Sequence, residues 1–314
     1  MSLKIITSFI QKPLVPLLLA TVGSTGLTSA GLTTLTSPDG SWSLSSDEFG
    51  AFGESVAGSF AQRDFGSGLT GYAWTAGVLI TDGTSSQWLA GDANFGMNGL
   101  TAIAASNVIS DVTSGNTRTS TFNVPNFSDL RVTLTQAATN DGISQQYSIT
   151  NLGGSSTDLR MISFQDVDLD GSTFTDNIIS VSGSTLGVSQ GTRTVGFTPD
   201  SNGYLGYLAG HVPGGGVTGN LDILAFSNSG IPAANLNQFV GFSGSGVIDS
   251  DFDTNLDMIS DSAADVGYLF QNNFTIGAGE TVDLTFLQGA AIPEPGSMAM
   301  LSLFGLATLL RRRR

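Results

Sequence analysis

Alternation of apolar and polar residues is the feature that most restricts what this chain can fold into. In one stretch Leu130, Val132 and Leu134 alternate with Arg131 and Thr133. A period of two places one set of side chains on a buried sheet face and the other set on a solvent face. The pattern predicts half-buried strands of antiparallel sheets.

The pattern recurs along the chain, and turn signals separate the repeats. Further alternating stretches lie at 72–80, 143–149 and 282–286. The turn signals between strands are Pro38-Asp39-Gly40, Asn140-Asp141-Gly142, Asn151-Leu152-Gly153-Gly154, Asp170-Gly171 and Ala278-Gly279-Glu280. Short strands at this spacing predict an all-β fold, an antiparallel β-sandwich, for a body spanning residues 31–290.

Two segments of the body have a recognisable form. The run Gln146-Tyr147-Ser148-Ile149-Thr150-Asn151 leads through a Gly/Ser turn into 159–170, and the chain later reads Gly279-Glu280-Thr281 in a hairpin. These segments resemble sandwich domains of secreted bacterial proteins. The resemblance implies a large two-sheet supersandwich, the form found in sugar-binding enzymes and mutarotase-like proteins.

The C-terminus combines a short breaker motif, an apolar run and a cationic end. Pro293, Glu294 and Pro295 precede fourteen uncharged residues, 297–310, and Arg311, Arg312, Arg313 and Arg314 follow. A helix of that length spans about 21 Å, which is short of the roughly 30 Å bilayer core. Terminal arginines favour a membrane helix with a cytoplasmic end over a buried core helix.

These three parts together resemble a PEP-CTERM sorting signal, here at 291–314. The resemblance implies that an exosortase recognises the signal and cuts near Pro293–Pro295, so that the hydrophobic helix is only a transient inner-membrane anchor. It also implies a bacterial protein delivered to the cell surface or to a matrix rich in exopolysaccharide. The partners expected on this basis are the exosortase, the secretion machinery and exopolysaccharide.

The N-terminus predicts the same topology. Lys4 and Lys12 precede an apolar stretch, and Thr28-Ser29-Ala30 is suited to cleavage. Residues 1–30 therefore form a signal peptide with a signal helix, and prolines at 13 and 16 make it unsuited to permanent anchoring. Both ends place their basic residues in the cytoplasm and leave the body outside.

The body between these ends is strongly acidic and free of cysteine. Removing the two signals leaves five arginines and 25 acidic residues, a net charge of −20. Nucleic acids and anionic membranes bind to basic patches, so neither is an expected partner. Without cysteine there is no disulfide framework and no thiol chemistry.

One local motif predicts a metal site. Asp166, Asp168 and Asp170 alternate and are followed by Gly171, an arrangement that can wrap oxygen ligands around Ca²⁺. The flanking segments have strand patterns and Asn177 stands where an EF-hand has Glu, so the motif is not an EF-hand. The alternatives are a non-helical calcium loop and an acidic turn without metal.

Other candidates carry less chemistry. The acidic residues 249–265 fit no ligand template and favour a solvated loop. His211 is the only histidine, and no serine-nucleophile motif or second histidine accompanies it, so no catalytic residues are predicted. Trp42, Trp74 and Trp88 would stack on sugars if exposed, although core packing is the default for such residues.

The expected function is that of a secreted, surface- or matrix-associated structural or adhesive protein without enzymatic activity. The alternative is a carbohydrate-binding or carbohydrate-active sandwich. A concave face with exposed aromatics and paired carboxylates would favour sugar chemistry.

Overall fold

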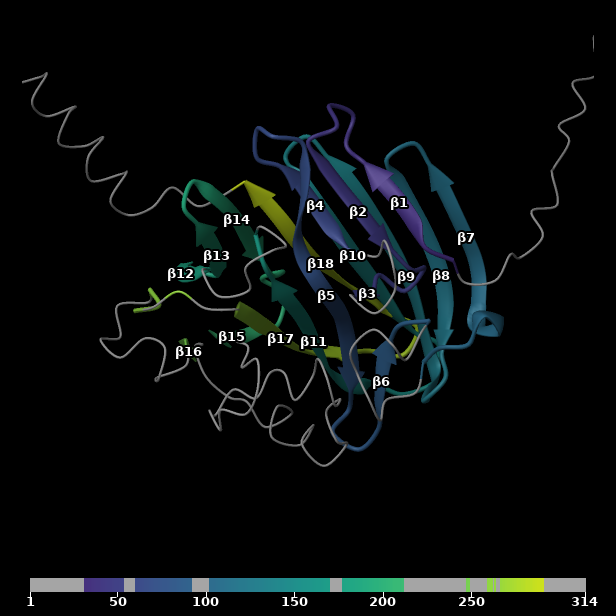
Figure 1. Cartoon of the computed structure of the whole chain (residues 1–314). Coiled ribbons are helices and arrows are strands. Elements are labelled where there is room, and N and C mark those ends of the chain that lie inside the picture. The colour runs from purple at the N-terminus through teal and green to yellow at the C-terminus, as the bar shows by residue number, and fades with distance from the viewer. Residues whose placement is uncertain are drawn as a thin grey trace, which may run out of the picture.

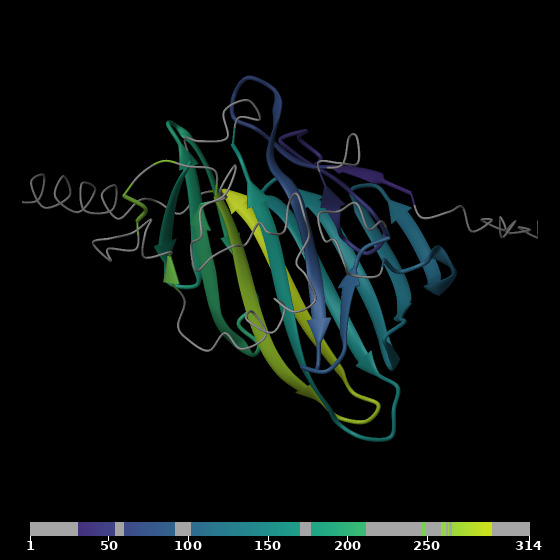
Figure 2. The same cartoon turned by 60° about the horizontal axis from the view of Figure 1, so that its bottom comes forward.

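The computed structural model describes residues 31–53, 60–91, 102–169, 177–211, 247–248, 259–261, 263 and 266–290. These residues form two large sheets that are stacked face to face (Figures 1 and 2). The pairing is antiparallel throughout, apart from the short parallel pair of β15 and β16. The expected all-β antiparallel sandwich is confirmed.

The first sheet has ten strands in the order β1-β2-β4-β5-β11-β17-β15-β16, with β3 and β6 pairing with β5. Its strands are β1 (Thr33–Thr36), β2 (Trp42–Ser46), β3 (Phe52–Gly53), β4 (Ala61–Asp64), β5 (Leu69–Thr81), β6 (Ser86–Leu89), β11 (Thr157–Val167), β15 (Tyr204–His211), β16 (Val247–Ile248) and β17 (Val266–Ile276).

The second sheet has eight strands in the order β12-β13-β14-β18-β10-β9-β8-β7. Its strands are β7 (Val108–Ser114), β8 (Thr117–Val124), β9 (Phe127–Thr139), β10 (Gly142–Asn151), β12 (Ile178–Ser182), β13 (Thr185–Gln190), β14 (Arg193–Thr198) and β18 (Thr281–Ala290). A single turn of 3-10 helix, η1 (Ala105–Asn107), precedes β7.

The alternation in the sequence explains the second sheet directly. On β9 the side chains of Leu130, Val132 and Leu134 are buried, while those of Arg131 and Thr133 face outward and are half-buried. β10 and β18 follow the same rule. The inward sets pack against the ten-stranded sheet in one continuous core.

The centre of the first sheet differs from the half-buried strands that the sequence predicts. Leu79 and Ile80 are consecutive on β5, and both are buried, so this strand is covered on both faces. On one face Trp88 of β6 lies over Gly77, where an added Cβ would approach the indole closer than 3.0 Å. The glycine leaves the space that the tryptophan occupies.

The predicted turns lie where expected. Hairpins at Pro38-Asp39-Gly40, Asn140-Asp141-Gly142 and Ala278-Gly279-Glu280 connect consecutive strands, and Gly40 and Gly279 both have a φ of 75°. The turn at 151–154 joins β10 to β11. Asp170-Gly171 lies outside the described residues.

Asn151 brings together the two segments that resemble secreted sandwich domains. Its buried side-chain amide donates hydrogen bonds to the carbonyls of Ser155 and Ile276 at 2.7 and 3.1 Å. Its backbone N–H donates to the carbonyl of Glu280 at 3.0 Å, and its own carbonyl accepts from Gly279 at 2.9 Å. The turn after β10 is thereby bonded to the hairpin between β17 and β18.

The two expected signals, at 1–30 and 291–314, lie outside the described residues, as do Pro293, Glu294, Pro295 and Arg311 to Arg314. Among the residues that are described, no helix has the length and apolarity to cross a bilayer.

Candidate functional site

The residues predicted to bind calcium are only partly placed. Asp166 lies on β11, next to a register shift in its pairing with β5, and Asp168 follows the strand with 1% of its surface exposed. Asp170 lies outside the described residues. Within the described ranges no group of three acidic or histidine side chains could hold a metal. Calcium binding by Asp166, Asp168 and Asp170 therefore stays a prediction.

The other candidates from the sequence do not assemble into a site. His211 is the last residue of β15, and of the acidic residues 249–265 only Asp261 is described, in an exposed position. Trp42 and Trp88 are buried, as the core-packing interpretation predicts. Trp74 lies on β5, and its side chain is outside the description.

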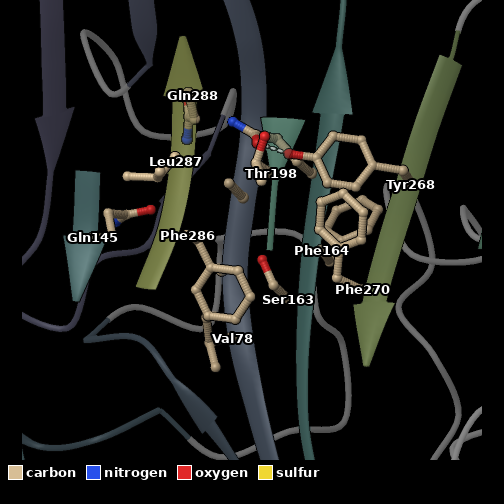
Figure 3. A pocket seen from close by; sticks show the side chains of 13 residues that line it. Val78, Gln145, Ser163, Phe164, Thr198, Tyr268, Phe270, Phe286, Leu287 and Gln288 are labelled. Atoms are coloured by element: carbon tan, nitrogen blue, oxygen red, sulfur yellow. Dashed lines mark hydrogen bonds between the residues drawn. The ribbon is translucent and has the colours of Figure 1, made fainter. Parts of the chain in front are cut away.

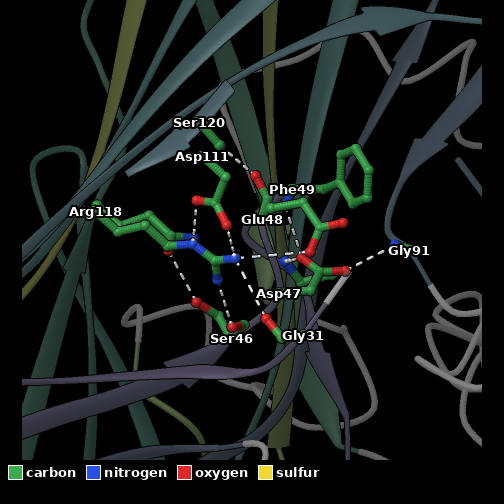
Figure 4. A network of polar contacts seen from close by, with 11 residues as sticks. Gly31, Ser46, Asp47, Glu48, Phe49, Gly91, Asp111, Arg118 and Ser120 are labelled. Carbon is green, nitrogen blue, oxygen red and sulfur yellow. Dashed lines mark hydrogen bonds and ion pairs between the residues drawn. The ribbon is translucent and has the colours of Figure 1, made fainter. Parts of the chain in front are cut away.

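Sequence reasoning missed a buried charged cluster between the two sheets, which is shown in Figure 4. Arg118 on β8 points inward, and its guanidinium donates to both carboxylate oxygens of Asp111, at 2.8 and 2.7 Å. It also donates to the carbonyls of Ser46 at 3.0 Å and Gly31 at 3.3 Å. The Glu48 carboxylate lies 3.7 Å from the same guanidinium.

A sequence signal for Arg118 was present. Arg118 shares the inward parity of Ser120, Phe122 and Val124 on β8, so the period of two alone places it in the interior. A buried guanidinium requires acceptors. The identity of those acceptors depends on strand pairing and on the β2–β3 turn, which the sequence pattern does not specify.

Next to Arg118, the β2–β3 turn holds Asp47 in a cage of backbone donors. The Asp47 carboxylate accepts hydrogen bonds from the N–H groups of Phe49, Ala51 and Gly91 at 2.9, 2.8 and 2.7 Å. Burial raises the pKa of Asp47 to about 7, although these three donors act in the opposite direction. Burial also raises the pKa of Glu48, against the attraction of Arg118.

The burial of this cluster suits a role in holding the fold together. Asp47 and Glu48 have 4% and 1% of their surface exposed. Glycosidase carboxylates must flank a bound sugar, and these two are enclosed by protein. The polar groups instead fix the β2–β3 turn between the sheets.

A second interior feature is a small polar cavity between β5, β11 and β17 on one side and β10, β14 and β18 on the other (Figure 3). Gln145, Gln165, Tyr268 and Gln288 contribute polar groups to its lining. Its volume of about 10 Å³ suits roughly one water molecule. Gln165 Nε2 has no hydrogen-bond partner and would be a donor to such a water.

The outer face of the eight-stranded sheet carries accessible polar groups at regularly spaced positions. We define the hydroxyl face as sixteen outward positions, four on each of β8, β9, β10 and β18. They are Thr117, Thr119, Thr121, Asn123, Arg131, Thr133, Thr135, Ala137, Ser144, Gln146, Ser148, Thr150, Thr281, Asp283, Thr285 and Leu287. All are half-buried or exposed, and ten carry a hydroxyl group.

Strand register arranges these positions as a four-by-four grid. One row runs Thr121, Thr133, Ser148 and Asp283, each directly opposite the next. Neighbouring strands lie about 4.8 Å apart, so the hydroxyl groups repeat at that interval across the face. Some bond to each other, as Thr121 and Thr133 do at 3.1 Å.

The face continues into a shallow hollow over β10, β18 and β14. The hollow measures about 370 Å³, and its lining includes Ser144, Thr198 and Leu287, with Gly196 and Gly289 among its backbone surfaces. Leu287 is 46% exposed. The lining therefore combines hydroxyl groups and glycine backbone with two apolar residues, Ile143 and Leu287, and one acidic residue, Asp141.

Comparison with known proteins gives no family. No protein-family model and no curated protein matches the chain. Among solved structures it is similar to a bacterial glucoamylase complexed with acarbose, with 11% identity and a TM-score of 0.49, over 88% of this chain and 34% of the glucoamylase. The chain thus spans about a third of that enzyme's length.

Two further similar structures have lower TM-scores. A putative aldose 1-epimerase from Escherichia coli K12 has 9% identity and a TM-score of 0.38, over 82% of this chain and 98% of that one. A galactose mutarotase-like protein from Clostridium acetobutylicum has 9% identity and a TM-score of 0.30, over 68% and 78%. Identities this low do not transfer an activity or a site residue to this chain.

Proposed function

We propose that this chain is an exported, non-catalytic adhesive protein that binds neutral polysaccharide through the hydroxyl face. The observation that carries the proposal is the grid itself, with ten hydroxyl groups, two side-chain amides and only two charged side chains, Arg131 and Asp283. Export and exosortase processing rest on the sequences of the two ends.

The charge distribution supports an uncharged ligand. The whole chain has a net charge of −15, whereas the sixteen positions of the face carry one acidic and one basic residue, Asp283 and Arg131, and have no net charge. Threonine favours strands, which accounts for threonine but not for the balance of charge on this face. A neutral sugar chain offers hydroxyl groups that both donate and accept hydrogen bonds, as Ser and Thr do.

The test compares binding of the full-length protein to insoluble neutral polysaccharides and to an acidic one. Replacing Thr119, Thr133 and Thr135 with Val keeps the β-branched shape and removes three central hydroxyls. Each lost hydrogen bond is expected to weaken binding roughly fivefold, and the melting temperature should fall only slightly, through loss of the bond between Thr121 and Thr133. Thr84→Val is the control, since Thr84 is exposed on the β5–β6 hairpin of the other sheet.

Equal binding by the triple variant, or no binding by the unaltered protein, would contradict the proposal. Release of reducing sugar during the incubation would instead favour the carbohydrate-active alternative.

A further inference from the structure

Strand β7 is an open edge of the eight-stranded sheet. It ends the strand order and, within the described residues, pairs only with β8. It has seven residues, against four for β1, five for β12 and two for β16, the other strands that end a sheet. In an antiparallel ladder, alternate N–H and C=O groups of such a strand point away from the sheet and can accept another strand.

The side chains of β7 are unusually accessible. Every residue from Ile109 to Ser114 is exposed, and Ile109 and Val112 have 47% and 62% of their surface exposed. Val112 is the most exposed large apolar residue in the described chain. Exposed apolar residues on an edge strand favour association with another strand.

Lysine and proline, which protect many edge strands, are missing from this edge. The sequence of β7 is Val-Ile-Ser-Asp-Val-Thr-Ser, which contains no lysine and no proline. A register shift between Val108 and Ser110 leaves Ile109 out of the ladder, and Ser110–Ser114 remain regular. The one charged residue, Asp111, is neutralised by its paired hydrogen bonds to Arg118.

We infer that β7 pairs antiparallel with β7 of a second copy of this chain. Charge supports this occupant, because the one acidic residue of β7, Asp111, is paired with Arg118, and this pairing reduces the repulsion between two strongly acidic copies at this edge. A two-fold pair is self-complementary, so each residue of β7 that meets a second residue of the partner strand is itself met by that second residue in the other copy. The two sheets join into one that runs through both molecules.

This pairing also affects the surface of the sheet. Ser110, Val112 and Ser114 lie opposite Thr121, Thr119 and Thr117 of β8, so β7 extends the rows of the hydroxyl face. Two copies joined at β7 present two such faces side by side. The self-pairing itself does not require the proposed polysaccharide, and its test contains none.

The test uses the absence of cysteine from the chain. Single cysteines replace Ser110, Val112 or Ser114 in the full-length exported protein, which is then oxidised mildly and run on a non-reducing gel. In a two-fold antiparallel pair only residues close to the axis face their own copies. Disulfide-linked dimer should therefore peak at one of these positions and fall at the others.

Two controls separate β7 from other routes to association. Leu152→Cys places an equally accessible thiol, 49% exposed, at the β10–β11 turn, and should give at least tenfold less dimer. Adding Val112→Lys to whichever of Ser110→Cys and Ser114→Cys gives the higher dimer yield should lower that yield at least tenfold, whereas Val112→Thr should preserve it. The Val112→Lys and Val112→Thr variants both keep the apolar run 297–310, so any association through that run would be the same in each.

Three outcomes would overturn the inference. The first is a dimer yield from the β7 cysteines no higher than that from Leu152→Cys. The second is a dimer yield that does not change when Val112→Lys is added. The third is a disulfide formed with a different protein in place of a second copy. Because Val112 is exposed, the melting temperature of Val112→Lys should stay within error of the parent, which excludes misfolding as the cause.

Discussion

At the scale of single residues, burial determines what Asp47 does. It lies in a turn between two sheets, where three backbone N–H groups bond its carboxylate. Burial still prevails and raises the pKa to about 7, far above the usual 3.8. A carboxyl group with this pKa takes up a proton in the folded protein under conditions where the unfolded chain has released it.

This shift predicts a stability that falls as pH rises. Between pH 4 and pH 7 the folded state holds one more proton at Asp47 than the unfolded state, so the free energy of unfolding decreases across that window and levels off above it. Asp47→Asn removes the titration. From pH 5 to pH 8 the parent should lose roughly 2–3 kcal/mol more than this variant, as measured by urea denaturation.

An exposed acid provides the control for this measurement. Asp141→Asn changes the net charge by the same amount at an exposed turn, so it separates the effect of net charge from that of the buried carboxyl group. Parallel profiles for the parent and Asp47→Asn would contradict the shifted pKa.

At the scale of strands and turns, the sequence predicted what depends on neighbouring residues. The period of two identified the faces of β9 and β10, and the glycine turns identified their hairpins. The sequence pattern could not show that β5 is covered on both faces, because consecutive apolar residues such as Leu79 and Ile80 fit a buried strand and a buried helix equally well. It also could not bring Asp111 to Arg118, since that contact depends on strand register.

Asn151 is the clearest case of a side chain whose importance emerges at this scale. Asn151→Ala removes the buried side-chain amide that donates to the carbonyls of Ser155 and Ile276. Such a loss costs about 1–3 kcal/mol, measurable as a lower urea midpoint. Asn140→Ala, at the exposed β9–β10 turn, is the matched control and should cost much less. Equal effects would show that the Asn151 bonds contribute little to stability.

At the scale of the whole molecule, the described strands, β1 to β18, form the two sheets of one sandwich. One continuous core lies between these sheets. The last described strand, β18, lies inside the eight-stranded sheet between β14 and β10. The pairs of β18 with β10 and β14 thus lie N-terminal to the proposed sorting signal. We therefore predict that folding and delivery are separable.

Deletion of residues 292–314 tests that separation. The shortened protein should keep its urea midpoint, because β18 retains its pairs with β10 and β14. It should be released to the medium instead of being retained transiently at the inner membrane, since the apolar run and the arginines are lost. Circular dichroism reports on folding, and cell fractionation followed by immunoblotting reports on location.

Replacing Arg311 to Arg314 with Gln keeps the apolar run and is the matched variant, expected to fold normally but to be processed less efficiently. A body that unfolds on deletion would show that the C-terminal segment belongs to the core, and unchanged location of both variants would contradict the sorting role.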